Sequence, residues 1–173
     1  MSKNKNKQYP GPDDENDLPV NMVNEPVQGF SSSYRFDIIL PNASNKPESQ
    51  LTDFEKMHIV RDGVSKNDLE LLKMKTALDY TMLAKALSVT RATLINKKKN
   101  EKFNAGLSEK ILGMADLYSY GFEVFEDENR FTQWMSKPNK ALGGQTPYDL
   151  IDNQFGREEV KNLIGRIDYG VYS

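Results

Sequence analysis

The sequence predicts an all-α protein: a helix-turn-helix bundle followed by a small helical domain, with a flexible N-terminal tail. Three observations lead to this fold class. Capping residues precede stretches in which apolar side chains recur every three or four positions, no convincing strand pattern follows residue 50, and the first fifty residues are polar. We therefore expect a tail over residues 1–50, a helix-turn-helix unit over 51–107 and a second helical unit over 108–173.

The segment 1–50 is rich in Asn, Ser, Pro, Asp and Lys, and its apolar residues are too scattered for a sustained pattern. Such a composition is typical of a flexible chain, because too little apolar surface is available for burial. One stretch departs from this polar composition. In residues 34–41 apolar and polar side chains alternate as they do in a strand, so this stretch could dock on the body of the protein or on a partner.

Two helix starts follow the tail. The run Thr52–Glu55 has the form of a capping box, in which each of the two end residues satisfies a backbone N–H of the other. This predicts a helix to about Arg61, ended by Gly63. Ser65 caps a second helix that runs to about Thr76.

The next segment has the order of a helix-turn-helix. A first helix carries an apolar stripe, and Thr90 caps a second, which we expect to extend through Leu94 to about Lys99. Ala84 is small enough for a close crossing, and Val89 fills the corner. Ser88 stands where a turn glycine is usual, so the turn has to form without the residue that adopts left-handed angles most easily. The stripe consists of Tyr80, Leu83, Ala84 and Leu87.

Polar and basic side chains on and after this second helix are suited to DNA. Five basic residues face one acidic residue, Glu101, which gives a local charge of +4. Their donors suit phosphates and base edges. A lysine run on a short helix is also typical of a solvated face in an ordinary helical bundle. The candidate DNA-binding residues are Thr90, Arg91, Thr93, Asn96, Lys97, Lys98, Lys99 and Lys102.

Four further helices complete the prediction. The first is long and has a broad apolar face, and the second is a short amphipathic turn that Pro138 closes. Thr146 and Pro147 then begin a helix that we expect Gly156 to end. The apolar faces consist of Ile111, Ala115, Tyr118, Phe122 and Phe125 in the long helix, Phe131, Trp134 and Met135 in the short one, and Val160, Leu163, Ile164 and Ile167 in the last.

Composition excludes several classes of function. The chain has no cysteine, so disulfides, thiolate metal sites and cysteine nucleophiles are excluded. With no secretion signal and no apolar run long enough for a bilayer, we expect a cytoplasmic protein. The single histidine, His58, has no partner motif, and the acidic residues between Glu123 and Glu128 lack the spacing of a ligand loop. We expect no enzyme activity, no metal and no cofactor.

The segment from Trp134 to Ser173 resembles the toxin-binding domain of Xre/ParS-type antitoxins, which belong to RES–Xre type II toxin–antitoxin modules. A tryptophan precedes a Pro-Asn-x-x-Leu-Gly-Gly-x-Thr-Pro loop, here residues 138–147, and a terminal helix leads into the sequence Tyr-Gly-Val-Tyr at residues 169–172. A helix-turn-helix followed by a long helix fits the same order upstream. The resemblance therefore covers roughly residues 50–173.

This resemblance implies an antitoxin whose partner is a RES-domain toxin that consumes NAD. It also implies operator binding, usually as a homodimer within a larger complex. The C-terminal segment would plug the toxin's active site through Arg166, Tyr169, Gly170, Val171, Tyr172 and Ser173. Three alternatives stay open: the terminal aromatics fold back as a lid on the body, the protein is a stand-alone transcription regulator, or DNA binding is vestigial.

Overall fold

A computed structural model describes residues 38–170, and the predicted all-α class is confirmed for this part of the chain. Residues 38–170 contain no strand, only one isolated antiparallel bridge between Ser65 and Lys102. No helix among these residues is long and apolar enough to cross a membrane. The α-helices are α1 (Asp53–Asp62), α2 (Lys66–Thr76), α3 (Tyr80–Ala86), α4 (Arg91–Ile95), α5 (Ala105–Phe125), α6 (Glu128–Met135), α7 (Pro147–Leu150) and α8 (Gln154–Asp168).

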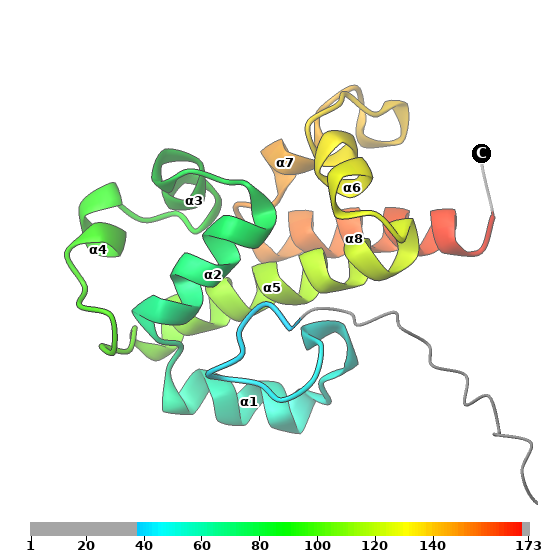
Figure 1. Cartoon of the computed structure of the whole chain (residues 1–173). Helices are drawn as coiled ribbons and strands as arrows, with labels where there is room; N and C mark the ends of the chain where they lie inside the picture. Colours follow the sequence, from blue (N-terminus) through cyan, green and yellow to red (C-terminus); the bar gives the residue numbers. More distant parts are fainter. Residues whose placement is uncertain (1–37, 171–173) are drawn as a thin grey trace, which may run out of the picture. The chain divides into compact units, whose positions relative to one another are not determined.

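The longest helix, α5, is the centre of the fold, and α1, α2, α6 and α8 all pack against it (Figure 1). Of the five apolar residues that predicted this helix, four are buried and Phe125 is partly buried. Asn104 begins the helix by accepting a hydrogen bond from the Leu107 N–H. Because α5 contacts elements from both expected units, the two units share one core.

The predicted caps of α1 and α2 are confirmed. The hydroxyl of Thr52 accepts from the Glu55 N–H while the Glu55 carboxylate accepts from the Thr52 N–H, so the capping box is complete. A nearby lysine, Lys46, also contacts this carboxylate and, with the Thr52 bonds, lowers the pKa of Glu55 to about 2. Ser65 caps α2 by accepting from the Asp68 N–H.

The expected tail is wrong for residues 38–50, which pack on the helical body. Ile39 and Leu40 are fully buried, and a short 3-10 helix (Glu48–Gln50) lies against α5. The buried carboxylate of Glu48 accepts hydrogen bonds from the backbone N–H groups of Ile39 and Leu40. Burial raises the pKa of Glu48. The expectation that the stretch 34–41 could dock on the body is confirmed for residues 38–41, whereas residues 1–37 lie outside the described part of the chain.

An aromatic cluster joins α5 to α6. The ring of Phe131 lies 5.3 Å from those of Tyr118 and Phe125, 5.6 Å from Phe122 and 5.8 Å from Trp134. Most of these pairs meet edge to face, the arrangement that the ring quadrupoles favour. The rings also pack against Gly121, where an added Cβ would come within 2.2 Å of the Phe131 ring. Phe131 and Trp134, predicted as part of one apolar helix face, therefore both pack on the core.

The end of α7 differs from the prediction. Thr146 caps this helix and Pro147 begins it, as expected, but the helix ends at Leu150 rather than before Gly156. Gly156 lies inside α8, which Asn153 caps. A Cβ at Gly156 would lie 1.7 Å from the Leu150 carbonyl oxygen. This glycine therefore allows the close approach of α7 to α8 and does not act as a stop signal.

Candidate functional site

The predicted helix-turn-helix pair forms as α3 and α4, joined by a tight turn. Ser88 adopts the left-handed conformation itself, with φ of 53°. The N–H of Val89 donates to the Ala84 carbonyl at 2.9 Å, which fixes the turn. Leu94 is fully buried and anchors α4 on the body. Thr90 caps α4 as predicted by accepting from the Thr93 N–H.

The second helix of this pair is shorter than predicted, because α4 ends at Ile95 rather than near Lys99. The chain beyond it forms backbone hydrogen bonds with the start of α2 instead of continuing the helix. The N–H of Asn67 donates to the Lys99 carbonyl at 2.9 Å, and the N–H of Phe103 donates to the Val64 carbonyl at 2.8 Å. Of the candidate residues, Lys97, Lys98, Lys99 and Lys102 therefore lie in a loop, which Asn96 begins as the C-cap of α4.

The basic candidate residues differ in whether their side chains already contact other groups of the chain. Lys97 donates to the Lys102 carbonyl at 2.7 Å, and the ammonium of Lys102 lies 2.6 Å from the Asp62 carboxylate. Arg91, Lys98 and Lys99 are exposed, and the described part of the chain places no carboxylate in an ion pair with them. These three cations are therefore available to solvent or to a ligand.

Polar contacts link α3 and its turn to the C-terminal part of the chain. The Tyr148 hydroxyl donates to the Met82 carbonyl at 2.9 Å, and the Ser88 hydroxyl donates to the Asp152 carbonyl at 2.8 Å. Lys85 forms an ion pair with Asp149 at 3.0 Å. This pair raises the pKa of Lys85, and the Thr146 hydroxyl together with Lys85 lowers the pKa of Asp149. These contacts hold α7 and the residues after it against α3 and the turn before α4.

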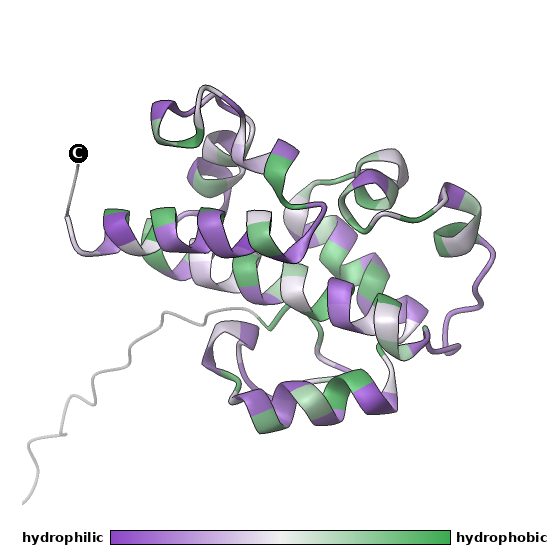
Figure 2. Ribbon diagram, turned by 180° about the vertical axis from the view of Figure 1, so that it is seen from behind, coloured by the Kyte–Doolittle hydropathy of each residue, from purple (hydrophilic) through white to green (hydrophobic). Residues whose placement is uncertain are grey.

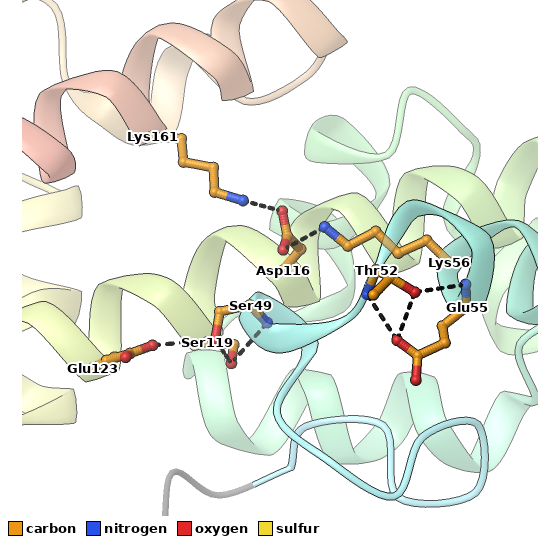
Figure 3. Close-up of polar contacts among 8 residues, drawn as sticks. All are labelled: Ser49, Thr52, Glu55, Lys56, Asp116, Ser119, Glu123 and Lys161. Carbon is orange, nitrogen blue, oxygen red and sulfur yellow. Dashed lines mark hydrogen bonds and ion pairs between the residues drawn. The ribbon is translucent and has the colours of Figure 1, made fainter.

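A second link holds α8 and α1 to α5 (Figure 3). The carboxylate of Asp116 in α5 accepts from Lys56 of α1 at 2.9 Å and from Lys161 of α8 at 2.6 Å. Asp116 is largely buried, whereas the two lysines are partly exposed. The aspartate thus ties helices from the two ends of the body to its central helix.

The candidate plug residues lie at the end of α8. Arg166 forms an exposed ion pair with Glu159 at 3.5 Å. Tyr169 follows the helix and its side chain is 82% exposed, so the alternative that it folds back as a buried lid is wrong for this residue. Gly170 has φ of 67°, in the left-handed region that glycine adopts without strain. Val171, Tyr172 and Ser173 lie outside the described residues.

His58 and the glycine pair of the loop before α7 all lie at the surface. His58 is exposed, with its ring 5.8 Å from that of Phe54. Gly143 and Gly144, in the loop before α7, both have positive φ, the conformation that glycine adopts most easily. Within residues 38–170 no group of three or more potential metal ligands is found.

Comparison with known proteins finds a family match for the C-terminal part of the chain. Residues 121–170 match the family described as the antitoxin Xre/MbcA/ParS C-terminal toxin-binding domain. A "Prs ADP-ribosylating antitoxin" of Sphingobium sp. is 26% identical over 130 residues, which cover 69% of this chain and 81% of the relative. An "Antitoxin Xre" of Yersinia enterocolitica is 25% identical over 116 residues, 66% of this chain and 78% of the relative.

A second "Antitoxin Xre", from Photorhabdus laumondii, is 36% identical over 73 residues, which cover 42% of this chain and 49% of the relative. The fold and the matched region together define an all-helical protein with a C-terminal toxin-binding domain, built from the end of α5 through α8. The C-terminal part of the chain is thus similar to the toxin-binding domain of the Xre/MbcA/ParS antitoxins, and longer stretches of the chain are similar to proteins named antitoxins.

Proposed function

We propose that this chain is an antitoxin that neutralises a RES-domain toxin that consumes NAD, and that it does so by placing its C-terminal segment in the entrance of the toxin's active site. It acts in the cytoplasm as a homodimer within a larger toxin–antitoxin complex. The plug comprises Arg166, Tyr169, Gly170, Val171, Tyr172 and Ser173. No catalytic role is assigned to this chain.

The exposure of Tyr169 is the observation that carries this proposal. Among residues 121–170, the part that matches a toxin-binding domain, Tyr169 has the most exposed large apolar side chain, at 82%. A tyrosine offers flat apolar area with a polar tip, the combination enriched at protein interfaces. Gly170 then permits the backbone to turn closely against a surface. The name of the Sphingobium relative, which refers to ADP-ribosylation, supports a toxin that uses NAD.

A competition assay tests this mechanism. The purified product of the neighbouring reading frame is assayed for NAD consumption with increasing amounts of the full chain. Because the plug and NAD share one entrance, the antitoxin concentration that halves the activity should rise in proportion to NAD once NAD exceeds its KM. A half-inhibiting concentration that is the same at low and at saturating NAD would contradict a plug at the substrate entrance.

We also propose that the α3–α4 pair binds the operator of the module and represses its transcription. Three side chains support this, since Arg91, Lys98 and Lys99 are exposed and lie outside ion pairs within residues 38–170. Thr90 and Thr93 are less available, because their hydroxyls lie 2.8 Å apart and hydrogen-bond to each other. Lys97 and Lys102 contribute indirectly. Their contacts within residues 38–170 hold the loop that carries Lys98 and Lys99.

The double substitution Lys98→Ala with Lys99→Ala tests the DNA contact. Binding to the duplex upstream of the gene should weaken, and the slope of log K against log salt should become shallower by about 0.9 for each phosphate that the variant no longer binds. Binding to an unrelated duplex should weaken to a similar degree. The matched control is Lys137→Ala with Lys140→Ala, which removes the same charge from two exposed lysines in the connection between α6 and α7. Equal slopes for the two double variants would contradict the proposal.

A further inference from the structure

One face of α8 carries exposed aromatic side chains for which the fold provides no use. Large apolar residues are exposed at five positions among residues 38–170: Phe54, Met74, Ile95, Phe155 and Tyr169. Only Phe155 and Tyr169 fall within the matched toxin-binding domain, and both are more than 80% exposed. Phe155 lies in the first turn of α8, whereas Tyr169 directly follows its last turn.

The helix geometry puts these two rings on one side. They are fourteen positions apart, which at about 100° per residue leaves them only about 40° apart around the axis and about 21 Å apart along it. The buried stripe of Val160, Leu163 and Ile164 packs against α5 on the opposite side. Figure 2 shows α8 alternating between hydrophobic and hydrophilic residues along its length, as an amphipathic helix does. We call Phe155, Glu158, Asn162 and Tyr169, all exposed, the outer face of α8.

We infer that the outer face of α8 docks on the toxin, with Phe155 as an affinity anchor separate from the inhibitory plug. This inference rests on the proposed function. The face leads directly into Tyr169, the first aromatic residue of the plug, so a partner that holds the plug lies next to the rest of the face. The two rings are about 21 Å apart along the helix, a span that one interface of standard size, about 800 Å² on each partner, can cover.

The side chains of the outer face determine which groups the surface of the toxin has to provide. Phe155 needs an apolar recess of the size of one phenyl ring, since exposed aromatic residues become binding hot spots when a pocket excludes water from them. Glu158 and Asn162 between the rings need donors and acceptors at the rim of that recess. The intramolecular partner of Glu158 is Gln154, at 2.7 Å on the same exposed helix, so this contact can be exchanged without loss of fold.

A second copy of the chain is the competing occupant. The outer face of α8 lies wholly within the residues that match a toxin-binding domain, which favours the toxin over a second copy. The continuity of the face with the proposed plug at Tyr169 favours the same partner.

The substitution Phe155→Ala in the full chain tests the inference, with Phe54→Ala as the matched control. Phe54 is 70% exposed but lies on α1, outside the matched domain. Binding to the product of the neighbouring reading frame is measured by calorimetry, and residual NAD consumption is measured at saturating antitoxin. Phe155→Ala should raise Kd at least about 30-fold, the range of a hot spot, yet still inhibit fully at saturation. Phe54→Ala should leave both unchanged.

The outcomes separate this inference from the proposed function. If Phe155→Ala binds the toxin as tightly as the unaltered chain, the anchor is wrong and the plug stands. The anchor is equally wrong if the variant instead changes the mass of the free antitoxin in sedimentation, since a second copy then covers the face. If the unaltered chain neither binds nor inhibits the toxin, both proposals fail.

Discussion

Replacing Phe131 by alanine is expected to lower the free energy of unfolding by about 3–5 kcal/mol. The ring is fully buried and lies within 6 Å of four other aromatic rings, so its removal takes away apolar burial and several edge-to-face contacts and leaves a cavity. A domain of this size is stable by only about 5–15 kcal/mol, so this change would remove a large share of its stability.

Urea unfolding followed by far-ultraviolet circular dichroism measures this effect. Trp134, the single tryptophan of the chain, gives a second signal because its ring stacks on Phe131. Phe54→Ala is the control, since truncation of a largely exposed ring should change stability by less than about 0.5 kcal/mol. Similar losses for the two variants would show that the aromatic cluster does not stabilise the fold as we describe.

Helix starts were the most predictable part of this fold, because a cap is a local device. Thr52, Ser65, Thr90 and Thr146 each satisfy backbone N–H groups within three residues, so neighbouring side chains alone specify them. Helix ends were less predictable. The early end of α4 follows from hydrogen bonds to the start of α2, about 30 residues earlier in the sequence, and Gly156 serves a close contact that only the folded chain reveals.

The candidate site could be predicted in part. Sequence placed the basic residues around α4, but the engagement of Lys102 with Asp62, forty positions earlier, depends on tertiary structure. The ion pairs of Asp116 with two lysines and the hydrogen bond between Tyr148 and Met82 also join distant segments, and no local pattern signals them. Phe155 was missed because the sequence placed it at the end of the helix that Gly156 was expected to close, whereas the structure puts it in the first turn of α8, opposite the buried stripe.

The last five residues are expected to be essential for neutralisation and dispensable for folding. Tyr169 and Gly170 add only two hydrogen bonds to the body, from their N–H groups to the carbonyls of Gly165 and Ile167, and both residues are exposed. Loss of such bonds costs roughly 0.5–1.5 kcal/mol each. A chain that ends at Asp168 should therefore keep its helices and its operator binding, which circular dichroism and a DNA-binding assay would verify.

Co-expression of this shortened chain, and of the full chain, with the neighbouring gene product tests the inhibitory plug most directly, with growth and cellular NAD content as the measurements. We expect the full chain to preserve both, whereas the folded chain ending at Asp168 preserves neither. Protection of growth and NAD by the shortened chain to the same level as by the full chain would contradict the plug.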